Sequence, residues 1–187
     1  RTLVIYNLND PDAADIASYY AARRGVAMER VCPVSLPRGN YATPKDLLGA
    51  RASIIEECFC ALLGADAPMP CGVDTLGDVL PMLLVSHLVI IRGVPARLVG
   101  TGWPSDGENP AFDFYLSVLL ANNLSLFGDG SSGQHTLAYP YREGLTVSSV
   151  PIDPAEHGYF AISRVEAINS ARTIALIDRI LDAEAHG

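Results

Sequence analysis

Residues 87–95 read HLVIIRGVP, an apolar run that ends in a charge, a glycine and a proline. Its first part, His87–Ile91, shows no alternation of apolar and polar residues. A short run of this kind is typical of a strand that is buried on both faces, as in the middle of a parallel sheet. We therefore predict that His87–Ile91 is the central strand of a mostly parallel sheet.

The rest of the chain alternates strand and helix signals on either side of this run. Further strands are predicted at Leu3–Tyr6, Arg30–Leu36 and Tyr159–Val165. Helices are predicted at residues 11–25, 44–64, 79–84 and 111–122 and from residue 170 onward. Residues 128–158 are rich in turn formers and show no clear period. The expected N-caps of three helices are Asp10, Thr43 and Ser170.

This alternation is the signature of a three-layer α/β sandwich. We expect a single α/β domain over residues 1–187, with a mostly parallel, four-stranded sheet, for which a flavodoxin-like order is one possibility. The first and last strands should flank His87–Ile91, because that run is the most uniformly apolar. Arg30–Leu36 should then lie at an edge, beside the first strand.

The composition excludes several classes of protein. Of the 187 residues 49 % are hydrophobic and 18 % charged, so the chain is too apolar to be disordered, and no apolar run is long enough for a membrane span. The net charge of −8, with no basic block, argues against a nucleic-acid partner. The glycine-rich motifs of dinucleotide and P-loop sites are missing, as is the GxSxG nucleophile elbow. We therefore expect no cofactor and assign no catalytic residue.

Histidine and cysteine also lack the spacing of a metal site. The four cysteines include no CxxC pair, and the four histidines are scattered singly, so we expect no bound metal. His157 and His186 each precede a glycine and are interpreted as exposed loop residues rather than as catalytic groups.

Polar residues gather where the predicted strands end, which is where parallel sheets bind ligands. The candidate binding residues are Asn7, Asn9, Asp10, Arg92, Gly93, Asp113 and Arg164. In one interpretation Arg92 and Arg164 converge on an anion, and Gly93 permits close approach of the backbone. In the other, each arginine pairs with a carboxylate such as Asp10 or Asp113 and fixes the loops, while the Asn9-Asp10 segment only turns and caps the chain.

The cysteines bear on the compartment of the protein. Cys60 is expected on the polar face of the helix at residues 44–64, and Cys71 in the loop beyond it. If the protein is exported, we predict a Cys60–Cys71 disulfide, whereas in a cytosolic protein both stay reduced. The remaining alternative is that both are incidental small residues. Cys32 lies in a predicted strand and Cys58 on an apolar helix face, so neither suits a nucleophile.

Several short segments together resemble one family. They are Val4-Ile5-Tyr6-Asn7, Pro11-Asp12, Tyr19-Tyr20-Ala21, Arg24-Gly25-Val26, Leu88-Val89-Ile90, Gly93-Val94-Pro95, Ala161 to Arg164 and Ala175-Leu176-Ile177-Asp178. Through them almost the whole chain resembles the N-terminal half of an uncharacterised bacterial family that co-occurs with the exosortase protein-sorting system. The resemblance names no reaction. It implies an extracytoplasmic protein that continues into a C-terminal part.

A more distant similarity runs to the gingipain-like cysteine peptidases of the caspase-like fold. It is carried by Tyr159 to Asp182, which looks like their strand ending in arginine and the amphipathic helix that follows. In those peptidases the catalytic dyad belongs to a later subdomain, so the similarity implies a non-catalytic first subdomain. It also implies a caspase-like order of the strands, as the alternative to a flavodoxin-like order. In the exosortase-associated family a segment like Asp-Ser-Glu-Leu follows the Gly-Val-Pro strand. Here Asp113-Phe114-Tyr115-Leu116 keeps the aspartate without the glutamate.

Two functions are therefore expected as alternatives. The first is a non-catalytic α/β subdomain of an export-associated bacterial protein, which binds or positions a protein partner or its own C-terminal domain. The second is an enzyme or binding protein for a small anionic ligand, with Arg92, Arg164, Asp10 and Asp113 at the carboxyl ends of the strands. Converging, unpaired guanidinium groups would favour the second. Guanidinium groups bonded to Asp10 or Asp113 would favour the first.

Overall fold

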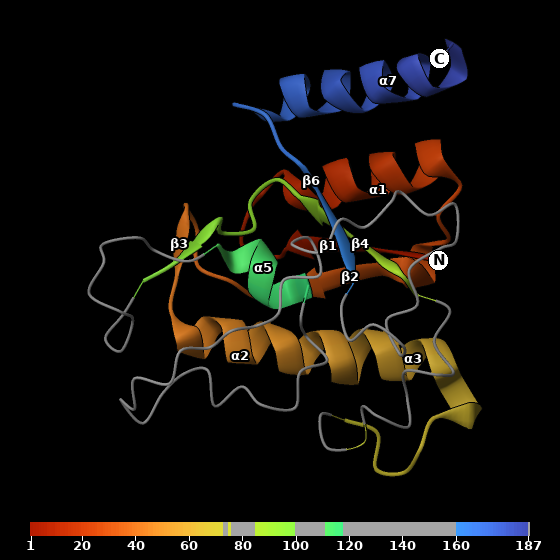
Figure 1. Cartoon of the computed structure of the whole chain (residues 1–187), viewed down its shortest axis with the longest axis vertical. Coiled ribbons are helices and arrows are strands. Elements are labelled where there is room, and N and C mark those ends of the chain that lie inside the picture. The colour runs from red at the N-terminus through yellow and green to blue at the C-terminus, as the bar shows by residue number, and fades with distance from the viewer. Residues whose placement is uncertain (73–74, 76–84, 100–110, 118–159, 187) are drawn as a thin grey trace, which may run out of the picture.

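Four parallel strands form the main sheet of the computed structural model, which describes residues 1–72, 75, 85–99, 111–117 and 160–186 (Figure 1). They are β1 (Thr2–Asn7), β2 (Val31–Val34), β4 (His87–Ile91) and β6 (Ala161–Val165). Their order is β2-β1-β4-β6, and every neighbouring pair is parallel. The prediction that His87–Ile91 lies inside the sheet, between the first and last strands, is confirmed. The order is also consistent with a flavodoxin-like sheet.

Both faces of the sheet are buried because apolar residues run continuously along the inner strands. In β4, Leu88 and Ile90 belong to one hydrophobic cluster, whereas Val89 and Ile91 belong to the other. Successive side chains of a strand point to opposite faces, so an unbroken apolar run supplies two cores at once. Helices cover each core, and the molecule has the three layers that the alternation of elements predicts (Figure 1).

One face is covered by a long helical rod, formed by α2 (Pro44–Ser53), the π-helical segment η2 (Ile54–Phe59) and α3 (Cys60–Leu63). The predicted N-cap is confirmed, since Thr43 Oγ1 accepts from the backbone N–H of Asp46 at 3.2 Å. The Asp46 carboxylate accepts in return from the backbone N–H of Thr43 at 2.8 Å, which completes a capping box. The cap explains why the helix begins directly after Thr43.

The other face is covered by α1 (Ala13–Arg24) and α7 (Ser170–His186), which lie side by side (Figure 1). Ile177 of α7 is buried in the cluster beneath them. Polar contacts join the two helices at the surface, where the Tyr19 hydroxyl donates to Asp178 Oδ1 at 2.7 Å. This hydrogen bond raises the pKa of the Tyr19 hydroxyl, because it stabilises the protonated donor.

The two other predicted N-caps are wrong by one or two residues. Asp12, not Asp10, is the N-cap of α1, because Asp10 Oδ1 accepts from the backbone N–H of Asp12 at 3.0 Å and forms a turn ahead of the helix. At α7 the cap is Asn169, whose side-chain oxygen accepts from the backbone N–H of Arg172 at 2.9 Å. Ser170 is the first residue of that helix instead.

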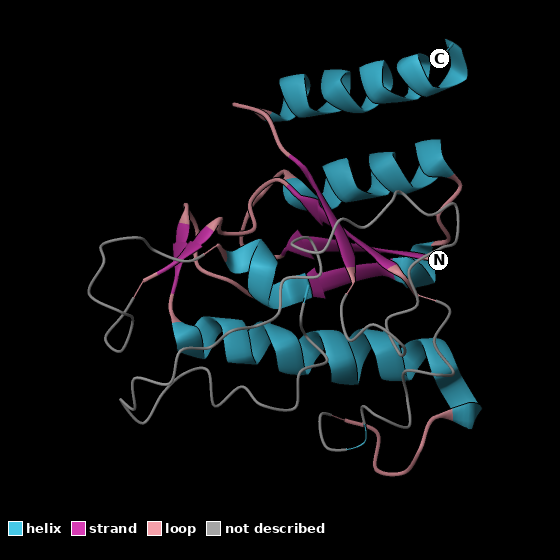
Figure 2. Ribbon diagram, in the orientation of Figure 1, coloured by secondary structure: helices cyan, strands magenta, loops and turns pink. Residues whose placement is uncertain are grey.

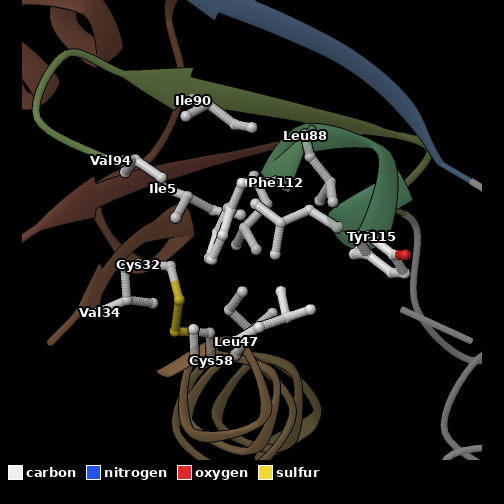
Figure 3. Packing of buried hydrophobic residues seen from close by; sticks show 14 of the residues in the cluster. Ile5, Cys32, Val34, Leu47, Cys58, Leu88, Ile90, Val94, Phe112 and Tyr115 are labelled. Atoms are coloured by element: carbon white, nitrogen blue, oxygen red, sulfur yellow. A yellow bond between two sulfur atoms is a disulfide. The ribbon is translucent and has the colours of Figure 1, made fainter. Parts of the chain in front are cut away.

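Two disulfides lie on the helical rod. Cys60 is joined to Cys71, as predicted for an exported chain, with the two Cα atoms 5.9 Å apart. Cys32 of β2 is joined to Cys58, with the Cα atoms 5.8 Å apart, and this pairing was not predicted. Figure 3 shows the second disulfide spanning the core between strand and helix. It therefore fixes the rod to the edge strand of the sheet.

Shorter elements complete the described chain. They are η1 (Met28–Arg30), β3 (Tyr41–Ala42), η3 (Gly64–Asp66), β5 (Arg97–Leu98) and α5 (Phe112–Ser117). β3 and β5 pair in parallel, and the chain enters them after the carboxyl ends of β2 and β4 (Figure 2). β2 is shorter than the predicted Arg30–Leu36 at both ends, because η1 takes up Arg30 and the backbone of Leu36 bonds to the side chains of Asn7 and Asn9 instead of continuing the strand. The helix expected at 79–84 and the unassigned stretch at 128–158 lie outside the described residues.

Candidate functional site at the carboxyl edge of the sheet

Asn7, the last residue of β1, is fully buried and connects two loops through its side-chain amide. Its Nδ2 donates to the carbonyl oxygens of Gly93 at 2.8 Å and Pro37 at 3.3 Å. Its Oδ1 accepts from the backbone N–H groups of Leu36 and Asn9, both at 3.1 Å. These four bonds use both donors and both acceptor positions of the amide. Asn7 therefore holds the loops after β2 and β4 together and has no group left for a ligand.

Asn9 makes a second connection between the same segments. Its side-chain Nδ2 donates to the carbonyl oxygen of Leu36 at 2.8 Å and to Ser35 Oγ at 3.2 Å. Its own carbonyl oxygen accepts from the Arg38 guanidinium. Asn9 thus fastens the chain that leaves β2 against the chain that leaves β1.

Gly93 lies in the turn after β4, packed directly against Asp10. Its φ of +96° is in the left-handed region, and a Cβ atom there would lie 2.6 Å from both Cβ and Oδ2 of Asp10. Real Cβ atoms do not approach so closely, so only glycine fits. The close approach brings the Asp10 carboxylate to the neighbouring residue, Arg92, whose Nη1 lies 3.2 Å from Asp10 Oδ2.

The guanidinium of Arg164, near the end of β6, donates hydrogen bonds from each of its three nitrogens. Its guanidinium makes a two-point contact with Asp113 of α5, in which Nε donates to Oδ2 at 2.8 Å and Nη2 donates to Oδ1. Nη1 donates to the carbonyl oxygen of Val94 at 2.7 Å and to Glu166 Oε2 at 3.0 Å. Nη2 also donates to the carbonyl oxygen of Pro95 at 3.0 Å. All three nitrogens of the fork are therefore engaged within the protein.

The electrostatics of Arg164 agree with this geometry. Burial by itself would lower the pKa of the guanidinium, but the hydrogen bonds and charge of Asp113, and then those of Glu166, outweigh burial and raise the pKa. Two carboxylates therefore face one guanidinium. An incoming anion would have to compete with both of them.

The structure thus brings the candidate residues to one edge and pairs the charged ones with each other. The Arg92 and Asp10 side chains are 25 % and 15 % exposed, and those of Arg164 and Asp113 are 18 % and 28 % exposed. Each arginine is paired with a nearby carboxylate, which is the arrangement expected in the second interpretation. We call this set of contacts the latch, because its hydrogen bonds and ion pairs connect the segments that follow β1, β2, β4 and β6. The side chains that form it are those of Asn7, Asn9, Asp10, Arg92, Asp113 and Arg164.

Several partners in this latch were not among the candidate residues, including Glu166 and Pro37. Glu166 lies two residues after Arg164, and alternate residues of a strand point to the same side, so the spacing could have suggested the pair. The carbonyl oxygen of Pro37, which accepts from Asn7, has no comparable signal. Its position depends on the path of the loop after β2.

Gly93 offers a direct test of this packing. Gly93→Ala is expected to lower the free energy of unfolding by about 3 kcal/mol, because the left-handed φ is strained for alanine and the new Cβ displaces Asp10 from Arg92. Chemical denaturation monitored by circular dichroism measures the loss.

Gly39→Ala is the matched control. Gly39 has a φ of +100° but nothing within 4 Å of its Cβ position, so alanine there adds strain without displacing a neighbour. We expect a loss of about 1 kcal/mol for this control. Equal losses at the two glycines would show that contact with Asp10 does not matter.

We compared the chain with family models, curated proteins and solved structures, and none of them matches it.

Within the described residues no group of three His, Cys, Asp or Glu side chains is placed to hold a metal ion. The helices of that same part of the chain include none with the length and apolar character to cross a membrane. His186 is exposed as expected, but it is the last residue of α7 rather than a loop residue, and His157 lies outside the described residues.

Proposed function

We propose that the chain is a non-catalytic α/β domain of an export-associated, extracytoplasmic protein, and that it binds or positions a protein partner or a following C-terminal domain. The observation that carries the proposal is that the Arg164 guanidinium is fully hydrogen-bonded to groups of the protein itself. Asp113, Glu166 and two backbone carbonyls take up all three nitrogens of its guanidinium. In an α/β domain this edge is the usual ligand site. A latch in that place favours a structural role over catalysis.

The disulfides support the extracytoplasmic part of the proposal. All four cysteines are paired, and stable disulfides are a feature of proteins in oxidising compartments. The resemblance to the exosortase-associated family points the same way. The similarity of the last strand and helix to a non-catalytic peptidase subdomain also agrees with a latch in place of a catalytic dyad.

Two large apolar side chains at this edge support binding of a protein partner. Leu8, directly after β1, is 57 % exposed, and Tyr41 of β3 is 52 % exposed. Both belong to segments that follow the carboxyl ends of main-sheet strands. A partner that docks over the latch could bury both side chains and would add apolar contact to an otherwise polar surface.

Titration with sulfate and phosphate separates this proposal from the anion-binding alternative. Because Arg92 and Arg164 are already paired, we expect no saturable change in the amide NMR signals of residues 7–10 and 93 at low ionic strength. Chloride at matched ionic strength is the control. A saturable shift that disappears in Arg92→Ala would favour the small-anion enzyme or binding protein and contradict the proposal.

A further inference from the structure

The two disulfides lie close together on the helical rod but in different surroundings. Cys32 and Cys58 are 1 % and 6 % exposed, and their disulfide is enclosed by core residues (Figure 3). Cys60 and Cys71 are each partly exposed. A thiolate must reach a sulfur atom in line to attack it, so access differs sharply between the two disulfides.

Helix geometry also keeps the disulfides apart. Cys58 and Cys60 are two positions apart, and at about 100° per residue, or slightly less in the π-helical segment η2, they point to nearly opposite sides of the helix. Cys58 therefore faces the sheet and binds Cys32, whereas Cys60 faces away and binds Cys71. A free thiolate at Cys60 is directed away from the buried disulfide, so opening one disulfide does not reshuffle the other.

The Cys60–Cys71 disulfide fastens a strap, which we define as residues 64–72. The strap begins at Gly64, whose φ of +56° turns the chain at the end of α3. It runs back along the rod until Gly72, whose Cβ position lies 3.5 Å from Glu56 Oε1. Glu56 precedes Gly64 by eight residues, so the strap returns over about two helical turns.

Within the described residues, few hydrogen bonds join the strap to the rod. In the described part of the chain Gly64 donates its backbone N–H to the carbonyl oxygens of Cys60 and Ala61 at the end of α3, and the hydrogen bonds of residues 65–72 run within the strap or to Thr75. The backbone N–H of Ala67 donates to the carbonyl oxygen of Gly64 at 3.3 Å, and the backbone N–H of Gly72 donates to Thr75 Oγ1 at 3.0 Å. Neither bond reaches the rod. Among the described residues the covalent link through Cys71, which packs partly buried against the core cluster, joins the far end of the strap to the rod.

We propose that Cys60–Cys71 is a thiol–disulfide exchange site for a dithiol reductant, and that its reduction releases the strap while the Cys32–Cys58 disulfide keeps the core intact. One thiolate of the dithiol attacks Sγ of Cys60 or Cys71, the Cys60–Cys71 bond breaks, and the other cysteine leaves as a thiolate. The second thiolate of the dithiol then attacks the mixed disulfide. The dithiol becomes a disulfide, and its two electrons and two protons reduce the cysteines. The inference goes beyond the proposed function and does not depend on whether the carboxyl edge binds an anion.

Graded reduction of the folded, oxidised protein tests the site. The protein is treated with dithiothreitol under native conditions, the thiols are alkylated, and the modified cysteines are identified by peptide mass spectrometry. We expect Cys60 and Cys71 to be alkylated at least about tenfold faster than Cys32 and Cys58. Release of all four thiols together, or of Cys32 and Cys58 first, would overturn the proposal.

Hydrogen exchange tests the release of the strap. After selective reduction, the amides of residues 64–72 should exchange at least about tenfold faster, while those of β1 and β4 are unchanged. The double variant Cys60→Ser/Cys71→Ser should show the same pattern without any reductant, and protein incubated with oxidised dithiothreitol is the matched control. A strap that stays equally protected in the reduced protein and in the double variant would contradict release.

Discussion

Replacing Arg164 with methionine is expected to lower the free energy of unfolding by about 3 kcal/mol. Methionine keeps much of the apolar stem but has no donor for the Asp113 carboxylate or for the carbonyl oxygens of Val94 and Pro95. Groups that lose their partners at a partly buried site cost far more than the net strength of the original bonds. Urea denaturation followed by circular dichroism measures the change.

Arg164→Lys is the control for charge. Lysine keeps the positive charge but has a single ammonium group in place of the planar fork, so it cannot bond both Asp113 oxygens and both carbonyls at once. We expect a loss between zero and that of Arg164→Met. Unchanged or increased stability in Arg164→Met would show that the arginine is held in the structure at a cost, as a ligand-binding residue often is.

The second large effect is expected at the buried disulfide. The double variant Cys32→Ala/Cys58→Ala should lose about 3.5 kcal/mol, because the link closes a loop with a sequence separation of 26 and restricts the unfolded chain. The alanines also leave the space of two sulfur atoms unfilled between β2 and the rod. Thermal unfolding should show a clear fall in Tm at neutral pH.

Cys60→Ala/Cys71→Ala provides the comparison for the buried pair. This disulfide closes a shorter loop, with a sequence separation of 11, and its sulfur atoms are partly exposed, so the variant should lose less stability. A larger loss here than in Cys32→Ala/Cys58→Ala would contradict the assignment of the core link to Cys32 and Cys58.

The main sheet could be predicted because its signals are local. An unbroken apolar run at His87–Ile91 needs cover on two faces, which places it inside a parallel sheet. The helix that follows Thr43 has a proline at its first position and a complete capping box, and its start was predicted correctly. At Asp10 the local signal failed, since the carboxylate that could cap the helix binds Arg92 and the backbone of Asp12 instead.

Other features depend on contacts that no local pattern encodes. Cys32 and Cys58 both fit the pattern of small apolar core residues, and only the packing of the rod on β2 brings them together. The π-helical turn at Ile54–Phe59 likewise has no sequence signature. At the site, pairing of the arginines with carboxylates could be expected from residue types alone. The bonds of Asn7 to Gly93 and Pro37 required the paths of two loops.

The most direct test of the latch is a double-mutant cycle between Arg164 and Asp113, which uses Arg164→Met, Asp113→Ala and the double variant. If the pair exists to hold the loops of the sheet together, the coupling in the free energy of unfolding should be at least about 1.5 kcal/mol. The same cycle on Arg92 and Asp10 should give a smaller coupling of the same sign, since that pair makes a single contact at 3.2 Å. A coupling near zero for Arg164 and Asp113, or greater stability when Arg164 is removed, would contradict a structural role for this edge.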